Sequence, residues 1–251
     1  MKLTLKNIGK IGTASVEING ITVIAGENNT GKSTVGRALF AVFNSFCNVQ
    51  KQIENERVDS IENLLDRMYM NGSSRFMRIA NTNEIAKTIV AHIDLYRQAE
   101  LFDMQKNIMD LLVQYDEGKI ESFDENTIAE TVSRIKDVLN VSGIDFLKSV
   151  LERKLDAEFN EQVCNIFSGD DGEIQLQIKD KIITVSVENE GSVDIQNPGD
   201  VSLHTEVVYI DDPFVLDDPS MFYRRIPSAS ADHRYHLRKK LFWPDTEANV
   251  F

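Results

Sequence analysis

Nine consecutive residues near the N-terminus have the types and the spacing that bind phosphate. They are Gly26, Glu27, Asn28, Asn29, Thr30, Gly31, Lys32, Ser33 and Thr34, and the first eight fit the pattern G-x-x-x-x-G-K-[ST] at every fixed position. In such a loop the backbone N–H groups surround phosphate oxygens, and the start of the following helix adds a favourable dipole. The pattern predicts that Lys32 contacts the β- and γ-phosphates of a nucleotide and that the Ser33 hydroxyl binds Mg²⁺. A glycine-bracketed turn before an ordinary helix is the alternative.

The residues on both sides of this loop fit the strand and the helix that it requires. The apolar run 21–25 precedes the loop and predicts a buried strand, and apolar residues at helical spacing from Val35 to Phe46 predict a helix. Residues 1–9 and 13–18 predict an antiparallel strand pair ahead of the loop strand. The dipeptide Asn19-Gly20 that follows is a strong hairpin signal.

With Asn28 included, the loop resembles that of the ABC-type ATPases of the SMC and RecF kind, which is written G-x-N-G-x-G-K-S/T. Asn29 departs from that motif, because the family usually has glycine there, but asparagine tolerates left-handed backbone angles better than most residues. The resemblance is close over residues 1–46 and looser beyond them. It implies a P-loop NTPase head that binds ATP and Mg²⁺, with a helical insertion between the two halves of the head.

The residues that would complete such a site are ambiguous. Residues 207–210 are apolar and are followed by Asp211, Asp212 and a proline, as in a Walker B strand. In that interpretation Asp211 holds Mg²⁺ and Asp212 activates the attacking water. Against it, residues 180–206 contain no signature of the L-S-G-G type, and Asp212 is shorter than the usual glutamate. The alternative is a strand that ends in an Asx-Pro turn.

Periodicity divides the rest of the chain. Residues 83–167 show helical spacing without strand signals, whereas residues 168–196 alternate with a period of two and predict an antiparallel meander. The expected fold is α/β: a P-loop NTPase head with N-terminal antiparallel strands, a helical insertion and a β meander. The expected domains are the N-terminal part of the head (1–82), the helical insertion (83–167), the meander with a strand returning to the head (168–220) and a basic C-terminal segment (221–251).

Composition places the chain among soluble globular proteins. It has 251 residues, of which 42% are hydrophobic and 27% charged, and this is enough for one large domain or two small ones. No apolar run is long enough to span a membrane, and Lys2, Lys6 and Lys10 interrupt any signal-peptide core. We therefore expect a cytoplasmic protein without membrane contact. Cys47 and Cys164 are expected to be buried thiols on apolar helical faces.

The net charge of −13 argues against a surface that coats nucleic acid. One strongly basic stretch stands out; its residues are Arg224, Arg225, Arg234, Arg238, Lys239 and Lys240. It could contact nucleic acid locally, or it could be a solvated helix end or an intramolecular partner for the acidic residues 211–218. His233 and His236 lie in the same stretch, and a surface or capping role is expected for them.

Three functions compete. The first is an ATP-binding module of an SMC/RecF-like ATPase that serves DNA repair, chromosome maintenance or anti-phage defence. The second is a nucleotide-binding regulatory module with little or no hydrolysis. A P-loop kinase or GTPase is the third, although the N-K-x-D guanine motif is missing. Because no complete second half is recognisable, we expect either a longer ATPase or a second head as partner, with nucleic acid bound through that partner or through residues 224–240.

Overall fold

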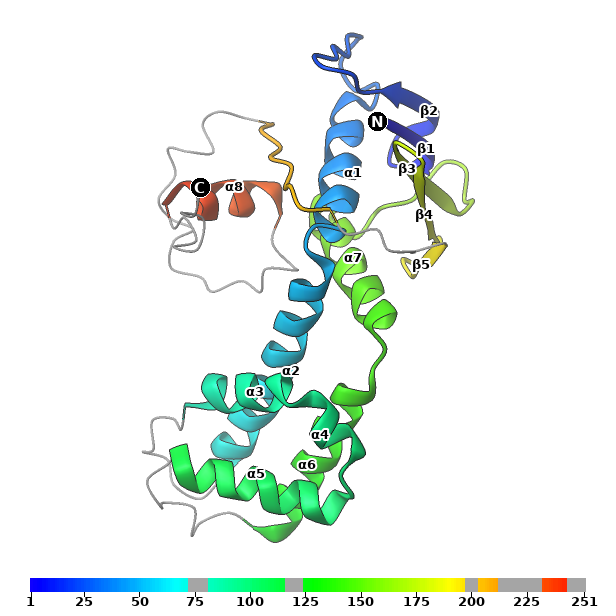
Figure 1. Ribbon diagram of the computed structural model, residues 1–251. Coiled ribbons are helices and arrows are strands. Elements are labelled where there is room, and N and C mark those ends of the chain that lie inside the picture. The colour runs from blue at the N-terminus through cyan, green and yellow to red at the C-terminus, as the bar shows by residue number, and fades with distance from the viewer. Residues whose placement is uncertain (72–80, 116–123, 197–202, 212–231, 243–251) are drawn as a thin grey trace. The chain divides into compact units, whose positions relative to one another are not determined.

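A computed structural model describes residues 1–71, 81–115, 124–196, 203–211 and 232–242 (Figure 1). The fold is α/β. Its elements are β1 (Lys2–Ile8), β2 (Ile11–Glu17), α1 (Lys32–Ser45), α2 (Val49–Asn71), α3 (Thr82–Ala91), α4 (Ile93–Gln98), α5 (Leu101–Tyr115), α6 (Glu125–Asn140), α7 (Gly143–Phe159), β3 (Gly172–Ile178), β4 (Lys181–Val187), β5 (Val193–Gln196) and α8 (His233–Phe242). The chain forms two compact units, which are residues 50–146 and the remainder.

The first unit contains an antiparallel sheet of five strands in the order β2-β1-β3-β4-β5. The predicted alternation is confirmed, because the apolar residues of β1, β3 and β4 lie opposite one another on one face. Leu5 pairs with Ile174, which in turn pairs with Val185, and each of these side chains is at most 1% exposed. Period-two patterning places such residues together only when one face of a sheet is buried.

Helix α1 lies against β1 and β3 in this unit. A helix follows the loop, as predicted; it begins at Lys32, and its buried face includes Val35, Ala38 and Val42. Cys47 and Cys164 are buried as expected. Both lie outside helices, however: each makes an isolated β-bridge, Cys47 with Leu203 and Cys164 with Ile8. Burial raises the pKa of both thiols and so favours their protonated form.

The second unit is helical throughout the residues that the structure describes. Helices α2 to α6 surround a core of buried residues, namely Ile61, Leu65, Met68, Ile85, Ala86, Ile89, Tyr96, Met104, Ile108, Leu112, Ile128, Val132, Ile135 and Leu139. Basic side chains satisfy carbonyl groups at two helix ends: Arg97 Nε donates to Leu139 O at 2.6 Å, and Lys136 Nζ donates to Ala99 O at 2.6 Å. These hydrogen bonds satisfy backbone carbonyl groups that have no intrahelical donor at the C-terminus of a helix.

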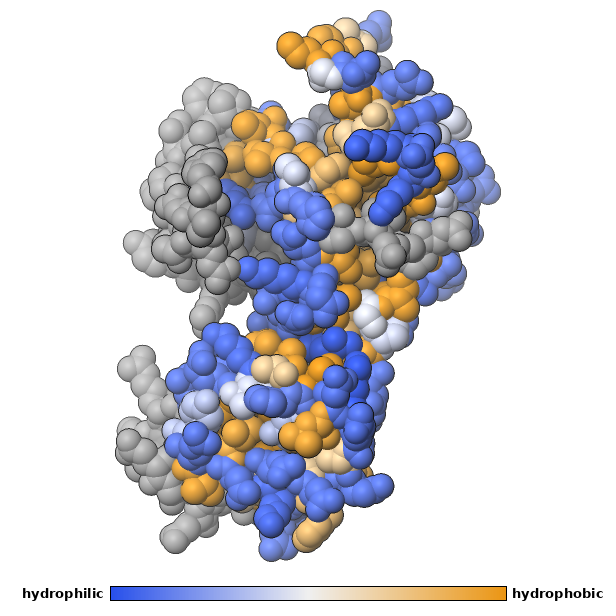
Figure 2. Space-filling model, in the orientation of Figure 1, coloured by the Kyte–Doolittle hydropathy of each residue, from blue (hydrophilic) through white to orange (hydrophobic). Residues whose placement is uncertain are grey.

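Two predicted strands are not formed. Residues 21–25 belong to no sheet; Ile21 and Val23 are 95% and 83% exposed, and apolar surface is visible at this end of the unit (Figure 2, top). Residues 205–210 are likewise outside any described ladder. Both predictions were wrong for the same reason. A strand needs a hydrogen-bonded neighbour, and the described sheet, which ends at β2 and β5, includes neither segment. The predicted P-loop head, which normally has a parallel sheet, therefore stays a prediction.

Among the described helices, none combines the length and the hydrophobicity that crossing a membrane requires.

Candidate functional site

The glycine-rich loop ends where α1 begins. Gly31 is the N-cap of the helix and has a φ of 91°, a left-handed value that a glycine adopts without strain. Asn29 also lies in the left-handed region, with a φ of 69°, so the asparagine takes the backbone shape expected of the family's glycine. No side chain of the described residues caps this helix, and its first turn contains no acidic residue. Neither a side-chain cap nor a first-turn acid among the described residues therefore neutralises the positive end of the helix dipole.

The side chain of Lys32 folds back over the loop. Its Nζ donates to the carbonyl oxygen of Gly26 at 2.9 Å and also to that of Glu27. The Thr30 hydroxyl donates to the same Glu27 carbonyl at 2.9 Å and holds the loop in a closed turn. Ser33 is exposed. The motif lysine thus occupies the concave side of its loop, with carbonyl oxygens as its acceptors.

The turn between β1 and β2 packs directly against the loop. A Cβ placed on Gly31 would lie 2.7 Å from Ile11 Cγ1, and a Cβ on Gly9 would lie 3.2 Å from Thr34 Cγ2. Both glycines have positive φ, at 91° and 56°, so close approach and backbone shape each require them. Lys10, between Gly9 and Ile11, donates from its Nζ to Asn29 Oδ1.

Residues 206–211 run beside α1, although they are not paired in a ladder. The Asn44 side chain replaces a neighbouring strand: its Nδ2 donates to Val207 O at 2.7 Å, and its Oδ1 accepts from Val207 N at 2.7 Å. The ring of Tyr209 packs on Gly36, where an added Cβ would lie 2.5 Å from a ring carbon. A side-chain amide and a glycine therefore fix this segment against the helix that follows the loop.

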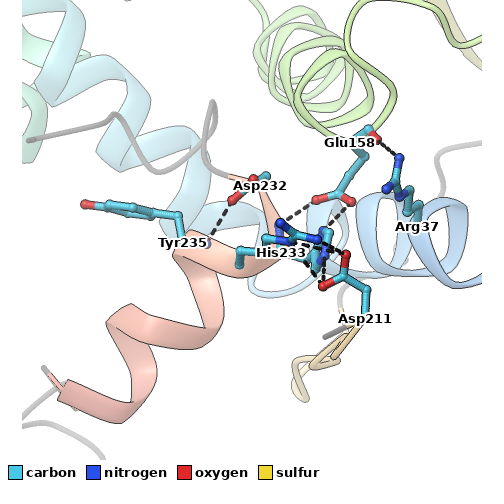
Figure 3. Close-up of polar contacts among 7 residues, drawn as sticks. Arg37, Glu158, Asp211, Asp232, His233 and Tyr235 are labelled. Atoms are coloured by element: carbon cyan, nitrogen blue, oxygen red, sulfur yellow. Dashed lines mark hydrogen bonds and ion pairs between the residues drawn. The ribbon is translucent and has the colours of Figure 1, made fainter. Parts of the chain in front are cut away.

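Asp211, the first acid of the predicted Walker B stretch, is held by two basic side chains (Figure 3). Arg234 donates to both carboxylate oxygens, with its NH2 atom 2.5 Å from Oδ2 and its Nε atom 3.1 Å from Oδ1. His233 Nε2 lies 3.1 Å from Oδ1, within ion-pair distance but outside the angles of a hydrogen bond. Asp212 lies outside the described residues. In this structure both oxygens of Asp211 are thus occupied by cationic partners.

His233 lies between two carboxylates. Its Nδ1 is 2.7 Å from Glu158 Oε2, its backbone N–H donates to Glu158 Oε1 at 2.5 Å, and Asp211 lies on the opposite side of the ring. The Glu158 side chain is fully buried and that of His233 is 5% exposed. Arg37 of α1 adds a hydrogen bond from its NH1 to the Glu158 carbonyl oxygen at 3.0 Å. Helices α1, α7 and α8 and the segment that contains Asp211 therefore meet in one polar cluster.

The charges of this cluster support one another. Burial favours the neutral ring of His233, but Glu158 and Asp211 outweigh it and raise the pKa of His233 above its ordinary value. Burial also works against the ionised form of Asp211, yet Arg234 and His233 lower the pKa of that carboxyl to about 2. At neutral pH Asp211 is therefore ionised and paired. The described residues contain no group of His, Cys, Asp or Glu arranged to hold a metal ion.

The basic stretch is partly accounted for by internal partners. Arg234 pairs with Asp211, and Lys240 Nζ lies 3.0 Å from Glu206 Oε2. The first of these is the intramolecular pairing that the sequence offered as an alternative to a nucleic-acid contact. Arg224 and Arg225, like the side chains of Arg238 and Lys239, lie outside the described part of the chain.

Sequence reasoning missed Glu158 and misplaced His233. The expected surface or capping role of His233 is wrong, because the residue is 4% exposed and its ring lies 4.6 Å, between centroids, from that of Tyr209. A signal for Glu158 was present: Leu151, Leu155 and Glu158 recur at spacings of four and three along α7. An acid on the buried stripe of a helix requires a partner, although the sequence does not say which one.

No protein-family model, curated protein or solved structure matches this chain, so its relationship to any family remains a prediction from the sequence.

Proposed function

We propose that this chain binds ATP with Mg²⁺ through residues 26–34 and is a nucleotide-binding module of the SMC/RecF-like ABC-type ATPase kind. The observation that carries the proposal is the junction of the loop with α1. The helix begins at the motif lysine, directly after a left-handed glycine, and has no acidic residue in its first turn. An uncapped helix start that follows a loop of this composition is suited to hold a polyphosphate.

Lys32 and Ser33 have distinct roles in the proposal. The ammonium group of Lys32 now donates to the carbonyls of Gly26 and Glu27, both neutral acceptors. Phosphate oxygens would be stronger acceptors, because they carry a negative charge that attracts the ammonium group, whereas a carbonyl is neutral. Ser33 would hold Mg²⁺ through its hydroxyl, and the ion supplies neutralisation of the phosphate charge when it is bound.

A module that binds ATP but hydrolyses it slowly is the favoured form of this function. Hydrolysis needs a carboxylate that orients the attacking water. Asp212, which was predicted for that role, lies outside the described residues. Asp211, the predicted metal ligand, is paired with Arg234 and contacts His233. Turnover would then require a partner that supplies missing groups, such as a second head. The roles in DNA repair, chromosome maintenance or anti-phage defence, and any contact with nucleic acid, rest on the family resemblance alone.

Isothermal titration calorimetry with Mg-ATP tests binding. Lys32→Ala is expected to weaken affinity by about 10- to 100-fold, because hydrogen bonds to charged groups contribute about 1.5–3 kcal/mol each. Lys87→Ala is the matched control: Lys87 is a surface lysine, 55% exposed, that pairs with Glu84 at 2.8 Å in the helical unit. Equal affinities for the parent chain and Lys32→Ala would contradict the proposal.

A phosphate-release assay tests the second part. The isolated chain is expected to turn over ATP slowly or not at all while still binding it. Rapid multiple turnover that is lost in Asp212→Asn, with unchanged ATP affinity, would instead show a complete enzyme with an active Walker B.

A further inference from the structure

The turn at Gly9, Lys10 and Ile11 contacts the proposed phosphate-binding loop. Two of its residues pack on loop residues: Ile11 lies against Gly31, and Gly9 against Thr34. The third, Lys10, contacts Asn29 through its side chain. Three successive residues of the turn therefore touch three positions of the motif.

The turn is anchored on its other side as well. Its neighbour Ile8 is 0% exposed and Ile11 is 7% exposed, so both are fixed in the core. The backbone N–H of Gly9 donates to Val163 O at 2.8 Å, and Ile8 pairs with Ile11 in the β1–β2 ladder. A side chain carried by this turn is thus presented from a rigid scaffold, as binding groups generally are.

Lys10 is the charged residue of this turn, and it is exposed. Its described partner is the Asn29 amide oxygen, a neutral acceptor on the residue that stands where related loops have glycine. Asn29 has a left-handed backbone, as a glycine could, so its backbone shape does not require the amide side chain. The contact places an ammonium group beside the middle of the motif.

We propose that Lys10 is a second phosphate-binding cation, which leaves Asn29 and contacts the polyphosphate chain when a nucleotide occupies the loop. This inference rests on the proposed function. A triphosphate with one Mg²⁺ remains negatively charged, and Lys32 is the only cation within the motif itself. Lys10 supplies a second cation beside Asn29, and it exchanges a neutral acceptor for a charged one.

The test uses the full chain and two titrants, Mg-ATP and inorganic tripolyphosphate with Mg²⁺. Lys10→Ala is expected to weaken the affinity for each titrant by about tenfold, since the substitution removes a charge-assisted hydrogen bond to the phosphates. Lys10→Arg is expected to restore most of the affinity. Lys179→Ala is the matched control, because Lys179 is an exposed lysine in the next hairpin turn of the same sheet, between β3 and β4.

Asn29→Gly separates phosphate binding from loop support. If Lys10 binds phosphate, Lys10→Ala weakens the affinity for ATP about tenfold in the Asn29→Gly background too, because Lys10 then contacts the nucleotide and not Asn29. If Lys10 merely holds the loop through Asn29, the second substitution has no further effect, and the proposal is overturned. If Lys10→Ala weakens the affinity for ATP but leaves that for tripolyphosphate unchanged, the proposal is also overturned, since Lys10 would then contact the nucleoside.

The two proposals fail in different ways. ATP binding that disappears in Lys32→Ala but is unchanged in Lys10→Ala overturns only the role of Lys10. A parent chain that binds neither titrant overturns the proposed function and this inference with it. Equal melting temperatures of the ligand-free parent and Lys10→Ala are expected, because the substituted side chain is exposed.

Discussion

Replacing Glu158 with glutamine should loosen α8 from the rest of its unit. The Glu158 carboxylate accepts from the backbone N–H of His233 at 2.5 Å and contacts Nδ1 of the same residue at 2.7 Å. Both contacts are made at the first residue of α8, and the Glu158 side chain is fully buried. Glutamine keeps the size of the side chain and one acceptor oxygen, but it removes the charge that faces the histidine.

The expected cost follows from the burial of the pair. Removing one partner of a buried ion pair costs about 3–5 kcal/mol, because the other charge is left without compensation. We expect about 3 kcal/mol for Glu158→Gln, the lower end, since the amide oxygen can still accept from the His233 backbone and Asp211 still faces the ring. That free energy corresponds to a rise of roughly 100-fold in the population in which α8 is open.

Hydrogen–deuterium exchange of peptides covering α8 measures that population. When opening and closing are fast, the exchange rate reports the opening equilibrium. The matched control is Glu130→Gln, which removes an equally charged residue that is 64% exposed and pairs with Arg134 at 2.5 Å on α6. An exposed pair of this kind contributes less than about 1 kcal/mol. If Glu158→Gln changes α8 exchange no more than Glu130→Gln does, the buried cluster does not hold the helix and the reasoning is refuted.

Three further predictions follow from single contacts. Raising the pH should loosen α8, because the pKa of His233 in the folded chain is raised above its ordinary value of 6.5. The stability that protonated His233 adds to the fold is complete below pH 6.5 and is lost as the pH rises through the raised pKa. A flat pH profile of α8 exchange, corrected for intrinsic rates, would contradict this. Gly36→Ala should cost about 1–3 kcal/mol in urea unfolding, because its Cβ would lie 2.5 Å from the tyrosine ring packed there, whereas Gly12→Ala meets nothing within 4 Å. Equal midpoints would rule out that close contact. Ile135→Ala, in the fully buried helical core, should cost about 2–5 kcal/mol by thermal unfolding, and Leu95→Ala, at a site 58% exposed, under about 0.5 kcal/mol.

Local patterns predicted the local parts of this fold. The alternation in residues 172–196 was sufficient for β3, β4 and β5, because the period-two pattern states which face is buried and short turns fix the register. The start of α1 at Lys32 was likewise predictable, since the motif specifies a helix at that position. In each case the information lies within a few residues of the element that it defines.

Contacts between residues far apart in the sequence could not be predicted from such local patterns. His233 and Glu158 are 75 residues apart, and the Asn44 amide reaches Val207 across 163 residues. The apolar run 21–25 shows the converse limit. Its composition suits a buried strand, yet strand formation requires a neighbouring strand, which the described sheet does not provide.

The ambiguity at Asp211 has the same origin, and it bears directly on function. Its sequence context suits both a metal ligand and the end of a strand, because an acid after an apolar run is common to both. What distinguishes them is the charge around the carboxylate, and that charge comes from Arg234 and His233, 23 and 22 residues further along the chain. Mg²⁺ would have to compete with a two-point arginine contact for the same oxygens. Loss of the Arg234 contact is therefore a precondition for any metal role of Asp211, so that nucleotide binding at the loop and release of Asp211 are separable events. Arg234→Met tests this: if Asp211 is a latent metal ligand, the ATP-bound variant should bind Mg²⁺ more tightly than the parent in calorimetry. Loss of α8 protection with unchanged Mg²⁺ affinity would assign Asp211 a structural role.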